Sequence, residues 1–339
     1  MKAAVYHGKQ NMTVEEVKKP EIGPGEVMIQ VKYCGICGTD IHIFNGDGGS
    51  TDVTPPLIPG HEFSGIVAAI GEHITSVQVG DRVCGDPNDM CGECYFCKNG
   101  QQHFCLNNTA VGVTADGGFA EYVVMREKQV YKIADSLSML KAAMVEPISC
   151  CIHGIDLCQI KTGDTVLVIG GGPIGIIMLQ MARNAGAAKV ILSEPVKEKR
   201  ELALELGADL AVDPLNENID EVLKGCCANI DKVIECVGST RTQADAVRLA
   251  GKGALIMFFG LTAPDDILPL KPDDIFKKEL TITSSYINPY TFERAIQVLE
   301  SGRVDVERII TNIVPLTDIT DAFTKPEFRT TGKVMVQIS

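Results

Sequence analysis

The sequence predicts an α/β protein in which a β-rich region precedes a doubly wound parallel sheet. From about Ser149 to Ser284, short apolar segments alternate with amphipathic helical segments, which is typical of parallel strands joined by helices. Before this stretch, strand-like runs are separated by Gly and Pro. A length of 339 residues is enough for two domains.

Composition excludes several classes of protein. The net charge is −13, which argues against nucleic acid or an anionic membrane surface as the main partner. No segment reaches the roughly 18 apolar residues of a spanning helix, and the first residues show no apolar signal-peptide core. Thirteen cysteines without such a signal favour thiols and metal ligands over disulfides. We therefore expect a cytoplasmic protein.

The individual elements follow from the apolar pattern. In the β-rich region, strand-like runs cover residues 26–31 and 119–124. The candidate parallel strands are residues 165–169, 189–193, 211–212, 232–236 and 254–259. The C-terminal part has one clear helical pattern at 291–301 and a strand-like run at 333–338.

A glycine loop follows the first of these parallel strands. Gly170, Gly172 and Gly175 form G-x-G-x-x-G, with Pro173 and Ile174 opening a helical run that continues to Asn184. The first glycine permits a tight turn, the second lets a pyrophosphate approach the backbone, and the third lets helix and strand pack closely. The helix N-terminus then faces the phosphates. A dinucleotide site explains this order better than a structural turn does.

The residue after the second strand indicates which dinucleotide binds. Glu194 lies nineteen residues past Gly175, where a carboxylate can accept hydrogen bonds from the adenosine ribose. It would repel a 2′-phosphate, so we expect NAD rather than NADP. Lys199 and Arg200 could receive such a phosphate, although a solvated helix face also explains them. Lys199 is kept as a cofactor-binding candidate.

Four cysteines form a compact motif in the β-rich region. Two overlapping C-x-x-C steps and one further cysteine place four thiolates within fifteen residues, at Cys91, Cys94, Cys97 and Cys105. Four thiolates complete a tetrahedron around zinc and leave no open position, which is typical of a structural site. An iron–sulfur cluster is the alternative to zinc at these four cysteines. A nucleic-acid-binding zinc module is disfavoured because the surrounding residues are mostly acidic.

Further residues able to bind a metal are dispersed. Cys37, His61 and Glu146 lie far apart in sequence, and Glu62 follows His61 directly. Cys37 could be a buried apolar cysteine, His61 a core histidine and Glu146 a strand-end acid. Spacing alone does not unite them in one site.

The motifs taken together resemble those of the zinc-containing medium-chain alcohol dehydrogenases, particularly the polyol dehydrogenase branch. The resemblance covers essentially the whole chain. It rests on the four-cysteine lobe, the glycine loop and, in order, on Gly35-Ile36-Cys37-Gly38-Thr39-Asp40-Ile41-His42, Gly60-His61-Glu62-Phe63-Ser64-Gly65, Val79-Gly80-Asp81-Arg82-Val83, Gly117-Gly118-Phe119-Ala120-Glu121-Tyr122 and Glu146-Pro147-Ile148-Ser149. It implies a GroES-like catalytic domain at 1–148 and 286–339, with a zinc lobe at about 84–108. A Rossmann NAD-binding domain at 149–285 is inserted between, and the active site lies in the cleft.

The resemblance also assigns roles. It implies that Cys37 and His61 bind a catalytic zinc, with either Glu62 or Glu146 as the third ligand and exchange between the two possible during turnover. Thr39 and His42 would relay a proton through the cofactor ribose, an exposed helix histidine being the alternative for His42. Val237 is included among the cofactor-binding residues. Cys34 is expected to pack only.

The resemblance leaves the substrate open. We expect hydride transfer between NAD and a secondary alcohol, with a sugar alcohol favoured by the carboxylates near the zinc and by the hydroxyls and amide of residues 284–290. L-Threonine, 2,3-butanediol and a sugar-alcohol phosphate are the alternatives. Reductases of the same fold lack the metal ligands, and a protein without turnover would not need the relay. The family also implies a homotetramer or homodimer formed through an edge strand near residues 254–259.

Overall fold

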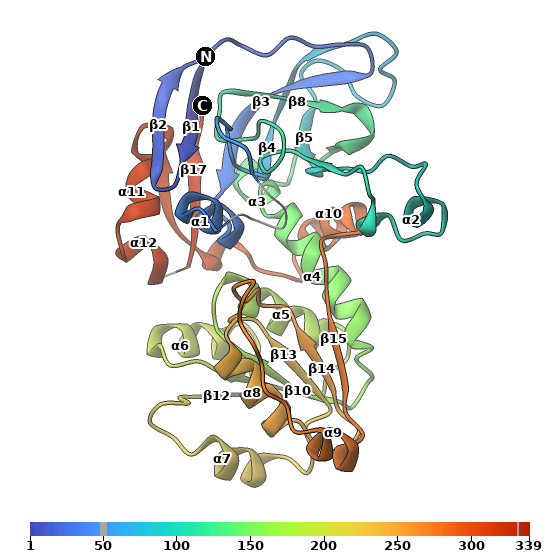
Figure 1. Ribbon diagram of the computed structural model, residues 1–339, viewed down its shortest axis with the longest axis vertical. Helices are drawn as coiled ribbons and strands as arrows, with labels where there is room; N and C mark the ends of the chain where they lie inside the picture. Colours follow the sequence, from blue (N-terminus) through green and yellow to red (C-terminus); the bar gives the residue numbers. More distant parts are fainter. Residues whose placement is uncertain (48–52, 331) are drawn as a thin grey trace. The chain divides into compact units, whose positions relative to one another are not determined.

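The computed structural model describes residues 1–47, 53–330 and 332–339. The chain divides into two compact units. Unit 1 comprises Met1–Ser149, Asn288–Gly302 and Val306–Ser339, and unit 2 comprises Cys150–Ile287 and Arg303–Asp305. Figure 1 labels the elements of both units. Unit 1 is therefore discontinuous in sequence, and each unit is described by itself below.

Unit 1 is built on antiparallel strands. Its main sheet has the order β16-β17-β3-β4-β5-β9, with β8 also pairing with β3, and two smaller ladders pair β1 with β2 and β6 with β7. The strands are β1 (Lys2–Gly8), β2 (Asn11–Glu16), β3 (Glu26–Gly35), β4 (Glu62–Ile70), β5 (Arg82–Gly85), β6 (Asn88–Asp89), β7 (Thr109–Ala110), β8 (Tyr122–Arg126), β9 (Val130–Lys132), β16 (Ile310–Pro315) and β17 (Lys333–Gln337).

The central strand of unit 1 is β3, whose apolar residues are buried on several positions in succession. It pairs antiparallel with β4, with β8 and with the late strand β17, where Val336 lies opposite Cys34. The core beneath contains Phe63, Phe119 and Phe323, all fully buried. The short helices are α1 (Gly38–Asn45), α2 (Tyr95–Lys98), α3 (Met139–Ala142), α10 (Phe292–Glu300), α11 (Ile319–Thr324) and α12 (Glu327–Thr330), and α4 (Val145–Cys158) continues from unit 1 into unit 2.

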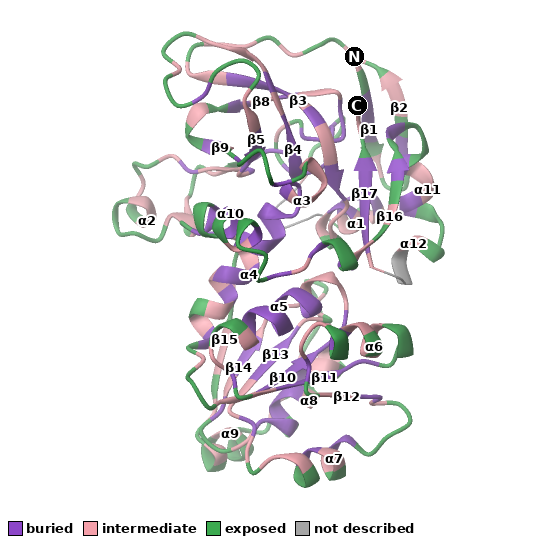
Figure 2. Ribbon diagram, turned by 180° about the vertical axis from the view of Figure 1, so that it is seen from behind, coloured by how far each residue is buried: buried purple, intermediate pink, exposed green. Residues whose placement is uncertain are grey.

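Unit 2 contains a six-stranded parallel sheet of order β12-β11-β10-β13-β14-β15. The strands are β10 (Thr165–Ile169), β11 (Lys189–Ser193), β12 (Leu210–Val212), β13 (Lys232–Glu235), β14 (Leu255–Phe258) and β15 (Thr281–Ser284). The helices are α5 (Pro173–Asn184), α6 (Lys197–Glu205), α7 (Ile219–Cys226), α8 (Thr240–Leu249) and α9 (Pro272–Lys278). The central strands carry the buried colour in Figure 2, as expected for a parallel sheet covered by helices.

The strand order of unit 2 reverses direction next to β10. The chain runs from β10 outward through β11 to β12, and then returns to β13 on the other side of β10 and continues to β15. The loops after β10 and β13 therefore flank the topological switch point, where open α/β sheets bind their ligands. The glycine loop lies at this point.

The α/β class is confirmed, while some elements differ from the prediction. The segment expected to form a sheet edge, residues 254–259, contains β14, which lies between β13 and β15, so the edge strand is β15. The predicted strand at 119–124 begins only at Tyr122, because Phe119 and Ala120 bond to Ala4 and Ala3 of β1 and do not pair with β3. Glu146 lies in helix α4 and does not end a strand. No helix in the described ranges is long and apolar enough to cross a membrane.

Candidate metal centres and dinucleotide site

The structure brings three dispersed residues of unit 1 together. Ligand atoms of Cys37, His61 and Glu62 all lie within 4.8 Å of one another. Cys37 caps the N-terminus of α1, and His61 and Glu62 lie where β4 begins. His61 is 6% exposed and Glu62 is 1% exposed. A thiol, an imidazole and a carboxylate at this spacing form a donor set that zinc accepts.

Asp40 supports this group from behind. It is fully buried, and its Oδ1 lies 3.5 Å from His61 Nδ1 while its Oδ2 accepts a hydrogen bond of 2.8 Å from the Cys37 N–H. A carboxylate on one ring nitrogen orients a histidine so that the other nitrogen can bind a metal. The sequence motif contains Asp40, but the sequence alone indicates no role for it. The signal was its place three residues after Cys37, which puts it in the first turn of α1.

The electrostatics of the group favour a cation. Burial lowers the pKa of His61, but the Asp40 carboxylate and the Cys37 thiol outweigh it and hold that pKa well above its usual value. Oδ1 of Asp40 and Nδ1 of His61 are buried and have no hydrogen-bond partner of good geometry. Surroundings that stabilise positive charge on an imidazole also suit a divalent metal ion, so the residues present fit zinc.

The Glu62 carboxylate has a positively charged partner, which comes from the last strand. Lys333 of β17, 5% exposed, forms an ion pair with Glu62 through its Nζ and the carboxylate Oε2. Nothing in the local sequence links these residues, because the contact depends on β17 pairing with β3 and β3 pairing with β4. Glu62 thus serves two positive partners, the ammonium group and any bound metal. Sequence reasoning missed Lys333 entirely.

The remaining residues predicted for this site have different positions. Glu146, 9% exposed and in the first turn of α4, is not part of the metal-competent group. Its predicted role at the metal therefore stays a prediction. Thr39 and His42 are half-buried and lie three residues apart on α1, so they share a helix face. Cys34 is fully buried in the core.

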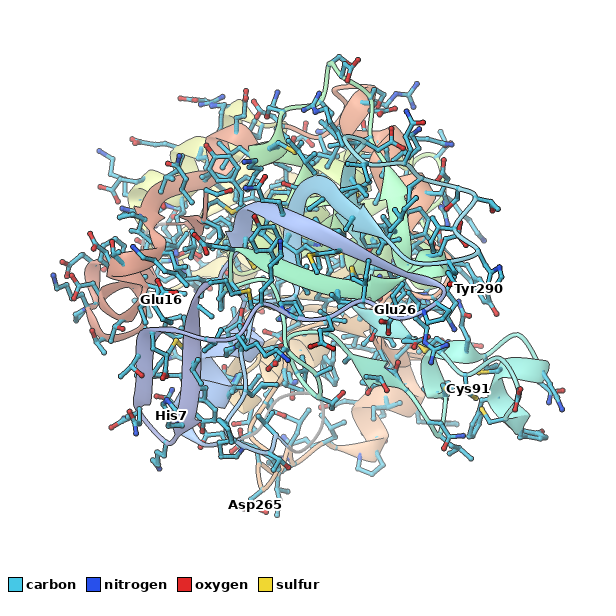
Figure 3. All side chains as sticks on the ribbon, turned by 90° about the horizontal axis from the view of Figure 1, so that it is seen from above. His7, Glu16, Glu26, Cys91, Asp265 and Tyr290 are labelled. Atoms are coloured by element: carbon cyan, nitrogen blue, oxygen red, sulfur yellow. The ribbon has the colours of Figure 1, made fainter. Side chains whose placement is uncertain are left out.

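The four cysteines of the lobe also converge. The sulfur atoms of Cys91, Cys94, Cys97 and Cys105 lie within 4.8 Å of one another, and Figure 3 labels Cys91 in this lobe. The backbone N–H groups of Glu93 and Cys94 each point at Cys91 Sγ at 3.4 Å. The N–H groups of Cys97 and Leu106 lower the pKa of Cys94 to about 6. Such donors stabilise thiolates, the form that binds zinc.

The glycine loop of unit 2 leaves room for a phosphate. Gly170 has φ +99, which favours glycine, and a Cβ on Gly175 would lie 1.8 Å from the Gly170 carbonyl oxygen. At Gly172 no protein atom lies within 4 Å of a Cβ position, so the backbone is open there. Helix α5 begins at Pro173, followed by Ile174. The arrangement exposes backbone N–H groups at a helix N-terminus, as pyrophosphate binding requires.

Glu194 lies directly beside this loop. It follows β11, is 5% exposed, and its Oε2 accepts a hydrogen bond of 2.6 Å from the Gly171 N–H. The Val196 N–H binds its other oxygen at 2.8 Å. Arg200 is engaged elsewhere: its Nη1 lies 3.1 Å from Asp213 Oδ2 and donates to the Glu194 carbonyl. Lys199 is half-buried on α6.

Val237 follows β13 on the other side of the loop. It is 52% exposed, and a Cβ on Gly170 would lie 2.6 Å from its Cγ2. The two loops that flank the switch point therefore touch. An exposed valine at this position offers an apolar surface to a bound ligand.

The segment at residues 284–290 differs from the expectation. Asn288, 2% exposed, accepts a hydrogen bond of 2.7 Å from Asn88 Nδ2 and donates one of 3.3 Å to Asp86 Oδ1. Both polar atoms of its amide are therefore bonded inside unit 1, and the expectation that this amide binds a polyol is not supported. Tyr286 and Tyr290 are exposed by 42% and 63%.

Comparison with known proteins gives consistent matches. Residues 23–135 match the family model "Alcohol dehydrogenase GroES-like domain", and residues 173–301 match "Zinc-binding dehydrogenase". The chain is 35% identical to D-arabitol-phosphate dehydrogenase of Enterococcus avium, covering 97% of this chain and 95% of that protein. It is 34% identical to L-threonine 3-dehydrogenase of Rhizobium etli, covering 99% and 98%. A solved structure from Sinorhizobium meliloti 1021, described as a zinc-binding dehydrogenase bound to NADP, has a TM-score of 0.95 and 38% identity over 99% of both chains.

Proposed function

Because the chain belongs to the zinc-binding dehydrogenases of the medium-chain alcohol dehydrogenase type, we propose that it transfers hydride between a secondary alcohol and NAD. The observation that carries the proposal is the buried Cys37–His61–Glu62 group with Asp40 behind the histidine. This group offers three ligands, so a fourth position is left for a substrate oxygen, as in catalytic zinc sites.

The chain's own residues have distinct tasks in this scheme. A bound zinc supplies Lewis-acid polarisation of the substrate oxygen and lowers the pKa of the alcohol. Cys37 and His61 hold the metal, Asp40 keeps His61 in one orientation, and Glu62 completes the set with Lys333 beside it. Glu146 is the alternative third ligand.

The proton released from the alcohol needs a route. We assign it to Thr39 and His42, whose places on one face of α1 support a hydroxyl-to-imidazole relay. Unit 2 would hold the hydride acceptor, with Gly170, Gly172 and Gly175 leaving room for its pyrophosphate.

NAD is the proposed cofactor because of Glu194. Its carboxylate lies at the glycine loop, where a 2′-phosphate would meet it in a partly desolvated site. At an effective dielectric near 20, repulsion between charges a few ångströms apart is worth several kcal/mol, so we expect a preference of about a hundredfold or more for NAD. The Sinorhizobium meliloti relative holds NADP, which makes this preference worth measuring.

The cofactor experiment compares kcat/KM for NAD and NADP in the wild type and in Glu194→Ser. The variant should weaken NAD binding and narrow the preference for NAD, because Lys199, or Arg200 once it leaves Asp213, can then face the phosphate. Lys197→Ser, which removes the partner of Glu201 on the exposed side of α6, is the control and should leave the ratio unchanged. A wild type that prefers NADP contradicts the role of Glu194.

We propose a sugar alcohol as the substrate class, since carboxylates near the metal accompany polyol chemistry in the family and one relative is named for an arabitol phosphate. A sugar-alcohol phosphate is the second candidate for the same reason. L-Threonine, the substrate named for another relative, and 2,3-butanediol are the remaining candidates.

The deciding experiment is a reduction assay with NAD and NADP over sugar alcohols, their phosphates, L-threonine and 2,3-butanediol. Cys37→Ser serves as the blank for each substrate. Activity on sugar alcohols supports the proposal, and a preference for a phosphate, threonine or the diol reassigns the substrate within the family. No turnover of any alcohol contradicts the enzymatic function.

Two further proposals concern the whole protein. We propose that the four cysteines hold a structural zinc, supported by the convergence of their sulfur atoms. We further propose that the protein resides in the cytoplasm, supported by thirteen cysteines that form no disulfide. We also propose a homotetramer or homodimer, supported by the edge position of β15. Sedimentation that detects only a monomer at micromolar concentration contradicts the oligomer.

A further inference from the structure

The carboxylate of Glu235 is buried at the end of β13 and forms no ion pair within the described part of the chain. Glu235 is fully buried, and its partners are neutral donors from the segment that follows. Its Oε1 accepts hydrogen bonds from the N–H groups of Val237 at 2.7 Å and Gly238 at 3.0 Å, and from the Thr242 hydroxyl at 2.9 Å. A buried carboxylate is stable only when such bonds satisfy it.

These bonds fix the loop after β13, and its close packing against the loop after β14 restricts it further. Gly238 has φ +78, and a Cβ there would lie 2.3 Å from the Leu261 carbonyl oxygen. In the same contact between the two loops, a Cβ on Gly260 would lie 2.1 Å from the Gly238 nitrogen. The Phe259 and Gly260 N–H groups both donate to the Glu235 carbonyl at 2.9 Å. The segment from Glu235 to Gly238 is therefore held by its side chain on one face and by the β14 loop on another.

The loop carries Val237 to a defined place at the switch point. Val237 touches the Gly170 region and is 52% exposed. The adenosine side of the sheet is marked by Glu194, which follows β11 on the far side of β10 from β13. The halves of a dinucleotide lie on opposite sides of the switch point. The β13 side, and with it Val237, thus belongs to the nicotinamide half.

We propose that Glu235 is a positioning residue for the nicotinamide half of the cofactor. Its carboxylate holds Val237 and Gly238, and through them the apolar surface that Val237 presents beside the glycine loop. This inference rests on the proposed use of a nicotinamide dinucleotide. It goes further in separating the two halves of the cofactor site. Glu194 would bind the ribose of the adenosine half, and Glu235 would position Val237 beside the nicotinamide half.

The test compares two ligands that share one half. NADH contains both halves, whereas ADP-ribose lacks the nicotinamide, so dissociation constants for both should be measured by calorimetry on the intact protein. In Glu235→Leu, buried N–H groups lose their acceptor, and we expect NADH to bind about tenfold more weakly while ADP-ribose changes by less than about twofold. Equal weakening of both ligands, or of neither, overturns the proposal.

Three variants guard against a purely structural reading. Glu235→Gln keeps one acceptor oxygen at the Oε1 position and should restore most of the NADH affinity. Thr242→Val removes one donor, so it tests the same loop if Glu235→Leu does not fold, and a loss for NADH of about threefold is expected. Asp231→Ala is the matched control, because Asp231 binds the Thr165 N–H and the Asn229 amide at the opposite end of β10 and β13.

The control separates stability from positioning. Asp231→Ala should lower Tm without changing the ratio of the two dissociation constants. A changed ratio in Asp231→Ala, or an unchanged ratio in both Glu235→Leu and Thr242→Val, contradicts the role of Glu235. A wild type that binds ADP-ribose and NADH equally tightly also contradicts it. A wild type that binds neither ligand overturns the proposed function itself.

Discussion

The two metal-competent clusters of unit 1 are built in opposite ways. The four cysteines come from fifteen consecutive residues, and backbone N–H groups of the same loop point at their sulfur atoms. Cys37 comes from the start of α1, His61 and Glu62 come from the start of β4, and Lys333 of the last strand pairs with Glu62. The first cluster is closed locally by the chain, whereas the second exists only when the sheet has formed.

The difference extends to chemistry. The lobe offers four thiolates and no vacant position, whereas the group at α1 offers one thiol, one imidazole and one carboxylate in a buried site. A closed tetrahedron suits a structural ion, and an incomplete one suits catalysis. The ligand set of each cluster thus predicts how readily a chelator removes its metal ion and whether that ion is needed for turnover.

The largest effect should come from the incomplete cluster. Cys37→Ser removes a thiolate ligand and with it several kcal/mol of charge stabilisation, so we expect kcat/KM to fall by about a thousandfold. His61→Ala should behave alike. Steady-state kinetics on the best alcohol, with metal content measured in parallel, checks this.

The control for that variant lies three residues away. Cys34→Ser alters a buried thiol that packs in the core, so kcat/KM should change little even if Tm decreases. Equal losses of activity in Cys34→Ser and Cys37→Ser would show that Cys37 is wrongly assigned as the metal ligand and that Cys34 does more than pack.

Metal release should distinguish the clusters next. We expect two zinc ions per chain, of which a chelator removes one readily and the other slowly, because the lobe encloses its ion with four thiolates. Loss of the first should abolish turnover while circular dichroism stays unchanged. Metal analysis during chelation provides the time course, and a single tight site in the active protein would contradict the scheme.

Lys333 offers a sharper test of the incomplete cluster. In Lys333→Met the Glu62 carboxylate loses its buried partner, which typically costs about 3–5 kcal/mol, so Tm should fall in metal-free protein. Added zinc should recover part of the loss, because the cation takes over from the ammonium. Lys132→Met, which breaks the half-exposed pair of Lys132 and Asp81, should lower Tm little with or without zinc. Equal shifts in both variants would contradict this.

The smallest effect concerns Asp86, which lies between β5 and β6 where the chain enters the lobe. Burial raises the pKa of Asp86 to about 6, so the native state holds its proton more tightly than the unfolded chain does. Stability is therefore lost as pH rises through the window between about 4 and 6. Asp86→Asn keeps an acceptor for Asn88 and Asn288 and should raise Tm at pH 8 by about 2–4 °C, with little change at pH 4. Thermal melts at both pH values check this, and an equal gain at both contradicts it.

Local patterns predicted what depends on local chemistry. The helical run to Asn184 is confirmed as α5, since its apolar periodicity and N-terminal Pro173 act within a few turns. The edge strand was predicted wrongly because apolar content marks burial and does not reveal which neighbours a parallel strand has. The apolar β14 is buried between β13 and β15, and the more polar and more exposed β15 forms the edge. Glu62 could be seen as a candidate, whereas Lys333 could not, since only long-range strand pairing unites them.

The discontinuity of unit 1 has a consequence for protein synthesis. A ribosome finishes every residue of unit 2 by Asp305, but β17 at Lys333–Gln337, which pairs with β3, comes later. A chain that stops after Asp305 thus contains every residue of unit 2, while its first 149 residues lack β17 as a sheet neighbour and Lys333 as a partner of Glu62. Premature termination after Asp305 would release a polypeptide with a finished dinucleotide unit and an unfinished metal unit, a product that quality-control proteases should recognise.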